Sequence, residues 1–468
     1  MIETFVNFTQ WIFLLYMIGL NIGYMMLNLN AVFFASAYMK TFEARKFIGL
    51  YTGYMPPVSI LVPAYNEELT IESSVRSLLQ LDYPQYEVVI INDGSTDGTI
   101  EKLKEAFLLQ PLGKAFRMRV PTQQVHTVYM SATHSNLKVV DKANGGKADA
   151  LNAGINISLY PLFCCLDADS ILERNSLKRI VMPFIENPLT VACGGTVRIA
   201  NGCDVREGFL EKVGLPGNLL ALIQIVEYLR AFLFGRLGWM PMNALLIISG
   251  AFGVFHKETV IDAGAYKRNT IGEDMELVVR LHAYMRSKGR PYHISFIPDP
   301  VCWTEAPEDL GTLRAQRIRW QQGLAESLAA NIGLLLNPRS GAIGWFAFPF
   351  MLFFEGLGPI VEVAGYVITI LGFLFDYISF EGMMMVLVLA ISMSITVSVV
   401  ALLLEEITFR VYPGIKNVFI LFIIAFIENI GYRQLTVWWR LIGVYRWLTR
   451  QEGEWGKMAR TASWSKNA

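Results

Sequence analysis

The chain has 468 residues, of which 53% are hydrophobic and only 17% are charged. An ordinary soluble domain is about 45–50% apolar and about 25% charged, so the composition argues against a soluble multidomain enzyme or a disordered chain. Basic and acidic residues each number 40, so no net charge draws the protein toward nucleic acids. The five cysteines have no CxxC spacing, which excludes a disulfide framework and a cysteine zinc site.

The N-terminal segment carries no charge between Glu3 and Lys40. Because about 20 apolar residues suffice to cross the hydrocarbon core, residues 1–40 are predicted to form one transmembrane helix. The stretch is too long for the apolar region of a signal peptide and lacks the basic residues that precede one.

Residues 57–322 have a different texture, in which short β-branched runs alternate with charged amphipathic stretches. Four runs indicate buried strands that end in polar residues: VSILVPAYN, YEVVIIND, LKVVDKA and YPLFCCLDAD. This alternation predicts an α/β domain with a doubly wound, mostly parallel sheet. Ligands of such sheets bind outside the carboxyl ends of the strands, where these polar residues lie.

Apolar segments return after this domain. We expect residues 323–343 to form an amphipathic interface helix and residues 344–447 to form three or four membrane segments. Glu355, Glu362 and Glu428 lie within apolar stretches, where a carboxylate is costly unless it faces protein, a partner or water. Two interpretations stay open: these acids line a polar path, or they pair with Arg433 and similar residues.

The tail, residues 448–468, contains more basic than acidic residues. By the positive-inside rule, this tail is predicted to be cytoplasmic. If the central domain is on the same side, the C-terminal membrane region crosses an even number of times.

Polar turns follow the first two predicted strands. The first contains Pro63, Ala64, Tyr65 and Glu67, and the second is NDGSTDG, which contains Asp93. A carboxylate at such a strand end can accept the N–H of a uracil or the hydroxyls of a ribose. The alternative is ordinary turn and helix-cap chemistry, which these residue types also favour.

Asp167 and Asp169 follow another apolar strand. Carboxylates two residues apart face opposite ways in an extended strand, but both can approach one ion where the strand end turns. Mg²⁺ and Mn²⁺ favour a few carboxylates together with phosphate oxygens. We therefore favour a metal site over a capped loop.

A glycine-rich loop, Asn144-Gly145-Gly146-Lys147, precedes a predicted helix. The two glycines allow close approach of a ligand to the backbone, Lys147 adds a positive charge, and the helix N-terminus can face a phosphate. The spacing is not that of a Walker A loop. A plain loop-to-helix junction is the alternative.

Glu273 and Asp274 begin an amphipathic helix. Asp274 is a candidate general base near an acceptor hydroxyl. The alternative is that acids in a first helical turn simply favour the helix dipole.

Gln316, Arg319 and Trp320 form a QxxRW motif. Arg319 can pair with a pyrophosphate, and Trp320 offers a flat face on which a sugar ring can stack. An amphipathic interface helix with arginines extended toward water is the alternative.

In this order, the motifs resemble those of membrane-integrated family 2 glycosyltransferases of the processive polysaccharide-synthase type. Relatives of that type make cellulose, hyaluronan, chitin or poly-N-acetylglucosamine, and the resemblance covers nearly the whole chain. It implies a glycosyltransferase A-type nucleotide-sugar-binding domain inserted between N-terminal and C-terminal transmembrane helices. It also implies a multi-pass protein of the cell (inner) membrane whose catalytic domain is cytoplasmic.

The resemblance assigns roles to matching positions. Asp274 matches the catalytic base of an ED pair with Glu273, and Asp167 and Asp169 match the acids that hold Mg²⁺ or Mn²⁺. Ser249 and Gly250, with Trp320, match the acceptor site. The positions that match the nucleotide-sugar site are Pro63, Ala64, Tyr65, Glu67, Asp93, Lys147, Asp167, Gln316, Arg319 and Trp320.

Two departures from the family pattern stand out. Asn92 replaces a first aspartate found in many relatives, and no cytoplasmic domain follows the last predicted span, so regulation by a C-terminal cyclic-dinucleotide domain is not expected.

The implied activity is inverting, metal-dependent elongation of a β-linked polysaccharide from UDP-glucose or UDP-N-acetylglucosamine, followed by export. The implied partners are the UDP-sugar, the growing glycan, the lipid bilayer and an accessory subunit for export. The polar path considered above would then carry the glycan. One alternative is a non-processive enzyme that loads a single sugar onto a lipid carrier. Another is a catalytically idle membrane scaffold.

Overall fold

The computed structural model describes residues 2–48, 54–113, 116–206 and 208–451, which belong to two compact units. Among the described residues, the helical unit takes residues 2–36, 218–244 and 307–451. The α/β unit takes residues 37–217 and 245–306. Residues 452–468 of the tail, predicted to be cytoplasmic, lie outside the described residues.

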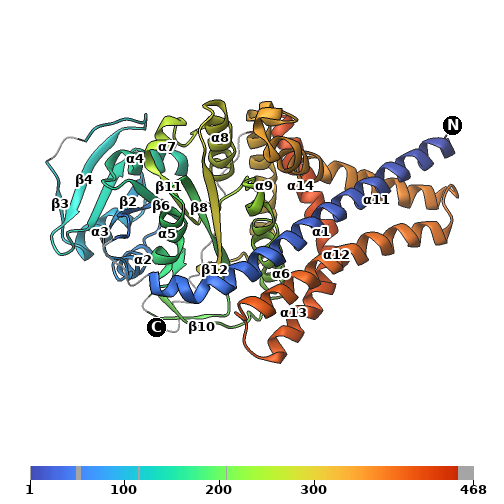
Figure 1. Cartoon of the computed structure of the whole chain (residues 1–468), viewed down its shortest axis with the longest axis horizontal. Coiled ribbons are helices and arrows are strands. Elements are labelled where there is room, and N and C mark those ends of the chain that lie inside the picture. Colours follow the sequence, from blue (N-terminus) through green and yellow to red (C-terminus); the bar gives the residue numbers. More distant parts are fainter. Residues whose placement is uncertain (1, 49–53, 114–115, 207, 452–468) are drawn as a thin grey trace. The chain divides into compact units, whose positions relative to one another are not determined.

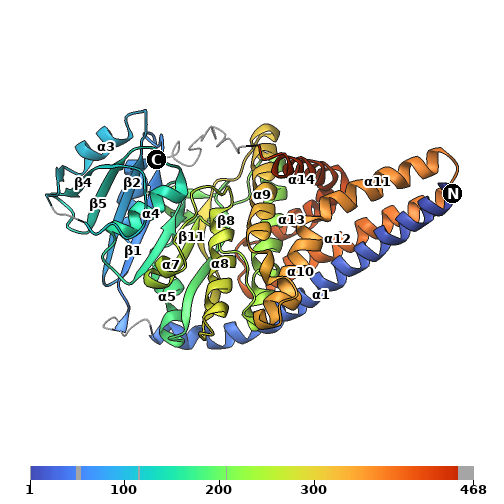
Figure 2. The same ribbon diagram turned by 90° about the horizontal axis from the view of Figure 1, so that it is seen from above.

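The α/β unit contains a sheet of ten strands within the described residues, in the order β3-β4-β5-β2-β1-β6-β11-β8-β12-β7 (Figures 1 and 2). A separate hairpin pairs β9 (Asp204–Arg206) with β10 (Phe209–Lys212). The strands of the large sheet are β1 (Val58–Ala64), β2 (Tyr86–Asp93), β3 (Leu109–Pro111), β4 (Val125–Ser131), β5 (Leu137–Lys142), β6 (Leu162–Leu166), β7 (Ile171–Leu172), β8 (Thr190–Ile199), β11 (Phe252–His256) and β12 (His293–Thr304).

The four strands predicted from the sequence form a parallel block at the centre of this sheet. β1 pairs in parallel with β2 and β6, and β2 pairs in parallel with β5. Their apolar runs are buried, as expected for parallel strands that are covered on both faces. The predicted fold class is confirmed. The sheet is also mixed, because β11 lies antiparallel between β6 and β8.

The helices of the α/β unit place functional residues at the carboxyl edge of the parallel strands. Gly154 of α4 lies so close to the side chains of Ile91 and Leu61 that a Cβ there would meet them at 3.0–3.2 Å. Helix α4 therefore packs directly on β1 and β2, with its first residue, Lys147, at the edge where β5 ends. These helices are α2 (Ile71–Leu78), α3 (Thr99–Ala106), α4 (Lys147–Ile157), α5 (Ser176–Glu186), α7 (Lys257–Asp262) and α8 (Glu273–Ser287).

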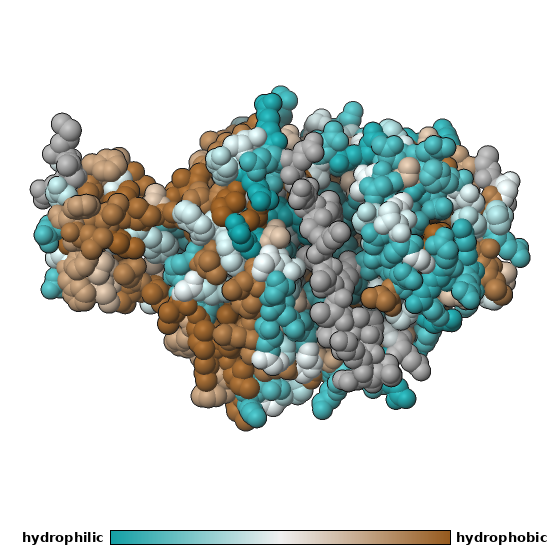
Figure 3. Space-filling model, turned by 180° about the vertical axis from the view of Figure 1, so that it is seen from behind, coloured by the Kyte–Doolittle hydropathy of each residue, from teal (hydrophilic) through white to brown (hydrophobic). Residues whose placement is uncertain are grey.

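The helical unit contains three helical stretches long and apolar enough to cross a membrane: Thr4–Lys40, Phe380–Thr408 and Ile415–Leu448. A pair bent by 42°, Ile343–Gly356 with Gly358–Leu374, is a fourth candidate. Large apolar side chains of these helices are exposed, among them Phe33, Met385 and Phe419, and Figure 3 shows broad apolar surfaces on the molecule, as is typical of a surface that contacts lipid.

The segments of this unit include several short helices between the long ones. Helix α1 also extends beyond residue 36 into the α/β unit. The bounds are α1 (Ile2–Ile48), α6 (Leu219–Leu229), η2 (Arg230–Phe234), η3 (Leu237–Met242), α9 (Leu310–Ala330), η4 (Ile332–Leu334), η5 (Pro338–Ser340), η6 (Ile343–Ala347), α10 (Phe348–Phe350), η7 (Met351–Gly356), α11 (Gly358–Leu374), α12 (Phe380–Thr408), α13 (Ile415–Ile427), η8 (Glu428–Tyr432) and α14 (Arg433–Leu448).

Residues 323–343, expected as one interface helix, divide among the end of α9 and the short helices η4 and η5. Leu336 adopts a left-handed conformation with φ of 50°, which interrupts any helix. Pro338 then begins η5, where its missing N–H is tolerated.

The three carboxylates in apolar stretches all have arginine partners within the helical unit. Each pair joins segments that are far apart in the sequence, and Arg230 also donates to Ser398 Oγ at 2.6 Å. This observation supports the pairing interpretation of these acids. The nearest N–O distances are 2.5 Å for Glu428–Arg230, 2.8 Å for Glu355–Arg440 and 4.0 Å for Glu362–Arg433.

We predict that Glu428→Leu destabilises the helical unit because Arg230 would keep its charge without its carboxylate. Breaking a buried ion pair by removing one partner costs about 3–5 kcal/mol, whereas replacing both partners with apolar residues is often neutral. The double variant Arg230→Met/Glu428→Leu should therefore recover most of the loss. Thermal unfolding in detergent measures both, and equal midpoints for Glu428→Leu and the unsubstituted protein would contradict the prediction.

Candidate active site

Several predicted site residues of the α/β unit lie at ends of elements on the carboxyl side of the parallel strands. Ser249 and Gly250 belong to the turn before β11, and Ser249 Oγ accepts from Ala251 N at 3.3 Å. The acidic and basic members are Asp93 at the end of β2, Lys147 at the start of α4, Asp167 and Asp169 after β6, and Glu273 and Asp274 at the start of α8.

Lys147 connects two of these elements. Its Nζ lies 2.5 Å from Asp167 Oδ1 and 3.5 Å from Glu273 Oε1. Burial alone would lower the pKa of Lys147, but the charges of Asp167 and Glu273 outweigh it and raise this pKa above its usual value. The ammonium group therefore stays protonated beside the two carboxylates.

Asp274 is held in place by backbone N–H groups on both sides. Its Oδ2 accepts from Gly250 N at 3.0 Å and its Oδ1 accepts from Met275 N at 2.8 Å. A Cβ on Gly250 would lie 2.9 Å from Lys147 Nζ and 3.5 Å from Asp274 Cβ. The glycine thus lets the predicted base and the lysine approach one another.

Two carboxyl groups of the cluster hold their protons more tightly than usual. Burial, and next the charge of Asp167, raise the pKa of Asp169 to about 7. Burial raises the pKa of Glu273 to about 7 as well, where the charge of Lys147 opposes the shift and that of Asp274 adds to it. The carboxyl groups of this cluster therefore outnumber the one positive charge, that of Lys147, which lies beside them.

This excess of acid fits a divalent cation. The ammonium group of Lys147 already lies beside the Asp167 carboxylate, which shows that this carboxylate attracts a cation. Among the described residues, no group of three or more histidine, cysteine, aspartate or glutamate side chains is arranged to hold a metal ion. Asp167 and Asp169 could hold an ion that takes its other ligands from a substrate, as Mg²⁺ commonly does with phosphates.

The loops that follow β1 and β2 brace one another. Asn66 N donates to Ser95 Oγ at 3.0 Å, and Thr96 N donates to Asn66 Oδ1 at 2.8 Å. Glu67 N donates to Thr99 Oγ1 at 2.9 Å. The turn chemistry considered for these two motifs is thus present in the structure.

The predicted residues of the first loop differ in their environment. Pro63 and Ala64 are the last two residues of β1, while the Tyr65 side chain is exposed. Glu67 is buried, and its Oε2 accepts from Thr70 Oγ1 at 3.0 Å. Tyr65 is therefore the member of this group with a side chain open to a ligand.

Asp93 makes several contacts inside the protein. Its Oδ2 accepts from Gly146 N at 2.7 Å and its Oδ1 accepts from Gly145 N at 3.1 Å. It also forms an ion pair with Lys142, which contacts Asp149 Oδ1 at 2.8 Å. Sequence reasoning missed Lys142 and Asp149. Strand β5 has the sequence LKVVDK, in which Lys142 is an ordinary polar residue at a strand end, so the sequence gives no signal for its contacts with Asp93 and Asp149.

Gln316, Arg319 and Trp320 lie on α9 of the helical unit, so their contact with the α/β site stays a prediction. Gln316 is buried and Trp320 is exposed. The guanidinium of Arg317 lies 4.5 Å from the centroid of the Trp320 ring, a cation–π geometry that occupies one face of the indole.

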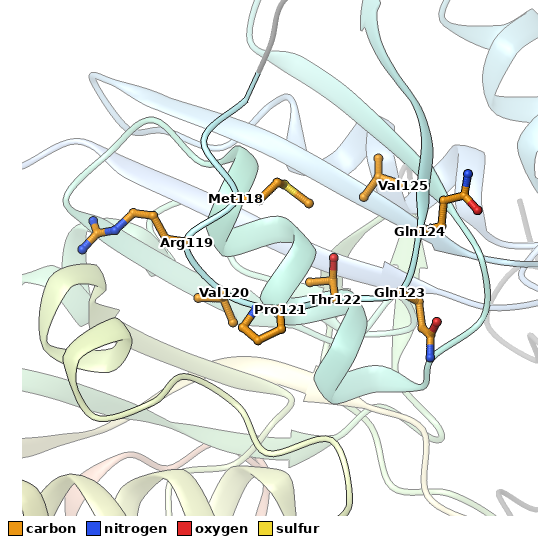
Figure 4. A pocket seen from close by; sticks show the side chains of 8 residues that line it. All are labelled: Met118, Arg119, Val120, Pro121, Thr122, Gln123, Gln124 and Val125. Carbon is orange, nitrogen blue, oxygen red and sulfur yellow. The ribbon is translucent and has the colours of Figure 1, made fainter.

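A hollow of about 470 Å³ is lined by the single chain segment Met118–Val125, which leads into β4 (Figure 4). None of its lining residues was predicted as a site residue. Gln123 of this segment donates its backbone N–H to both oxygens of Asp149, at 3.0 and 3.1 Å. The segment therefore supports the first turn of α4, which begins with Lys147.

An acid-rich strand edge with Lys147 at a helix N-terminus could hold a divalent cation and, through that cation, the phosphates of a ligand. The chain matches the family model described as glycosyl transferase family 2 over residues 59–209 and that described as glycosyl transferase family group 2 over residues 162–426. The second match covers more than half of the chain, so the protein belongs to glycosyl transferase family group 2. The predicted membership is confirmed.

Among curated proteins, the chain is similar to poly-beta-1,6-N-acetyl-D-glucosamine synthases. It is 30% identical to the Staphylococcus epidermidis protein over 307 residues, which are 65% of this chain and 62% of that relative. It is 32% identical to the Staphylococcus aureus (strain COL) protein over 274 residues, which are 58% of this chain and 55% of the relative. The matched region thus spans less than two thirds of the length of these relatives.

Two solved structures are more distant. A mannosyltransferase from Pyrobaculum calidifontis in complex with GDP-Man and Mn²⁺ has 17% identity and a TM-score of 0.47, covering 91% of this chain and all of that one. S. aureus TarS 1–349 in complex with UDP-GlcNAc has 15% identity and a TM-score of 0.39, covering 86% of this chain and 95% of that one. With TM-scores below 0.5, neither supports an argument about this site.

We predict that Gly250→Ala leaves the fold intact but lowers activity. The new methyl group would lie 2.9 Å from Lys147 Nζ, which can swing away because it ends a flexible side chain. A displacement of about 1 Å at a catalytic group can cost about a hundredfold in rate. Sugar transfer by purified protein, with circular dichroism as the control for folding, measures this effect. Full activity in the alanine variant would contradict it.

The raised pKa of Glu273 predicts a pH-dependent stability. The unfolded chain releases this proton near pH 4.5 and the folded protein near pH 7. The stability contributed by the protonated group is therefore present below about pH 4.5 and is lost as the pH rises through about 7.

In Glu273→Gln this loss should be absent, so the variant should gain stability relative to the unsubstituted protein between pH 5 and pH 8. Unfolding midpoints at several pH values measure the difference. A constant difference across this range would show that Glu273 is not a buried acid with a raised pKa.

Proposed function

We propose that the protein is an inverting glycosyltransferase that adds N-acetylglucosamine from UDP-N-acetylglucosamine to a growing β-linked glycan. The observation that carries the proposal is the placement of Asp274 beside Lys147, with both meeting at Gly250, in a member of this transferase family. The similarity to poly-beta-1,6-N-acetyl-D-glucosamine synthases supports the choice of sugar over glucose.

Asp274 would act as the general base. Its two backbone hydrogen bonds fix the carboxylate, which takes the proton of an acceptor hydroxyl as that oxygen attacks the anomeric carbon. The bond from this carbon to the diphosphate breaks, and UDP leaves with the bonding electrons. One displacement inverts the anomeric centre, so an α-linked donor gives a β-linked product.

Lys147 would stabilise the negative charge that develops on the departing diphosphate. Its ammonium group is charged, partly buried and carried by a helix N-terminus, a position that favours anions. Because Lys147 contacts both Asp167 and Glu273, it is held in place before the donor arrives.

Asp167 and Asp169 would hold Mg²⁺ or Mn²⁺ together with the donor diphosphate. A bound divalent cation supplies electrostatic stabilisation of the leaving group. The metal requirement is part of the proposal, supported by the uncompensated acid at this strand end.

The remaining predicted residues belong to the same proposal. Tyr65 and its loop would contact the nucleotide, Ser249 and Gly250 the acceptor, and Gln316, Arg319 and Trp320 the diphosphate and the glycan. The apolar helices would anchor the protein in the cell membrane with the α/β unit on the cytoplasmic side and export the product, with or without an accessory subunit.

We predict that Asp274→Asn abolishes transfer but retains UDP binding, because the amide cannot take a proton although it keeps the size and position of the carboxylate. Membranes would be incubated with UDP-N-acetylglucosamine or UDP-glucose plus Mn²⁺, and the product digested with linkage-specific hydrolases. Calorimetry would measure UDP binding.

Asp204→Asn, an exposed change in β9, is the matched control and should retain transfer. Normal elongation by Asp274→Asn would reject the base, and a product of one sugar on lipid would reject elongation. A polymer made from UDP-glucose alone would reject the sugar assignment.

A further inference from the structure

The residues that hold the glycine-rich loop form a buried chain of charges behind the proposed active site. Lys142 ends β5 and lies between two acids, Asp93 of β2 and Asp149 of α4. The side chains of Lys142 and Asp149 are 0% exposed and that of Asp93 is 4% exposed. Lys142 is therefore too deeply buried to touch a bound donor.

Both acids act on the loop that leads to Lys147. Asp93 accepts the backbone N–H groups of Gly145 and Gly146. Asp149 packs against Gly145 so closely that a Cβ on that glycine would lie 2.6 Å from Asp149 Oδ1. Asp93 thus holds the loop by hydrogen bonds to its backbone N–H groups, and Asp149 holds it by packing against Gly145.

Lys142 contacts both of these acids and so links Asp93 to Asp149. Its Nζ forms an ion pair with Asp93, lies 2.8 Å from Asp149 Oδ1 and donates to Ala143 O at 2.6 Å. Arg268, which is partly exposed, adds a second positive charge at 3.3 Å from Asp149 Oδ2. The negative charges of the two acids are thus matched by the positive charges of Lys142 and Arg268, and Lys142 is the buried cation that contacts both acids.

The position of Lys147 follows from this arrangement. Gly146 adopts a φ of 83°, which directs the chain into α4, and Lys147 is the first residue of that helix. Any shift of Gly145 and Gly146 would therefore move Lys147 relative to Asp167.

We propose that Lys142 is a positioning residue for donor binding: through Asp93 and Asp149 it sets the glycine-rich loop and thereby places Lys147 against the donor diphosphate. This inference rests on the proposed function, because it needs a nucleotide diphosphate as the ligand of Lys147. It also gives Asp93 a structural task beside any contact with the nucleotide.

The structure offers a matched control on the same strand. Lys138 lies four residues before Lys142 on β5 and pairs with Glu87 at 2.7 Å, with side chains 8% and 3% exposed. Glu87 accepts from Ser59 Oγ and Leu159 N, groups outside the glycine-rich loop. Lys138→Met therefore removes a comparable buried ion pair without freeing the loop.

The experiment is calorimetric titration of the full-length purified protein with UDP in the presence of Mn²⁺. We expect Lys142→Met to bind UDP about tenfold more weakly, the effect of losing one hydrogen bond to a charged group. Lys138→Met should bind UDP as the unsubstituted protein does, although both variants unfold at lower temperature.

A second variant covers the case in which Lys142→Met does not fold. Lys142→Met/Asp149→Asn removes one charge of each sign, so no acid is left in excess, and the asparagine carbonyl can still accept from Gln123 N. The double variant should recover part of the thermal stability, because Asp149 no longer carries a buried charge without Lys142, but it should not recover UDP affinity, because Asp93 has still lost its buried partner.

The outcomes separate the two proposals. Unchanged UDP affinity in Lys142→Met, or in the double variant, would overturn the positioning role and leave the proposed function standing. An equal loss of affinity in Lys138→Met would also overturn it, since the effect would then be general destabilisation. Failure of the unsubstituted protein to bind UDP would instead overturn the proposed function.

Discussion

Charge compensation at the carboxyl edge of the sheet is the constraint on which the site depends. Parallel strands bring their polar ends to one edge, and here these ends are largely acidic. Buried carboxylates are costly unless cations or backbone N–H groups face them. Lys142 and Lys147 provide the cations, and the N–H groups of the loop and of Gly250 provide the donors. The excess of carboxylates makes this edge unfavourable on its own. It also makes the edge suitable for a divalent ion that can carry a diphosphate.

The parallel half of the fold could be predicted from the sequence because its signal is local. Runs such as YEVVIIND are buried on both faces and end in polar residues, so the pattern gives both the strand and the edge that carries chemistry. Strand β11 carries a weaker signal. It is five residues long and becomes a strand through its antiparallel pairing with β6 and β8, which lie far away in the sequence.

The site was predictable where a residue's role shows in its neighbours in the chain. Asp167 and Asp169 after a strand, and Asp274 at a helix start, could be found in this way. Lys142 and Asp149 could not, because their role arises from contacts between β2, β5 and α4. The end of the helix at Ala330 was missed although Asn331 caps it and Pro338 follows, both residue types that favour a helix end.

The ion pair between Arg230 and Glu428 bears on how the protein is made. The carboxylate that neutralises this arginine is synthesised 198 residues later, on a different apolar segment. Until then Arg230 lacks its main partner, and a cation without that partner is unfavourable among apolar helices away from water. The helical unit can therefore reach its final packing only after the segment that carries Glu428 has been synthesised.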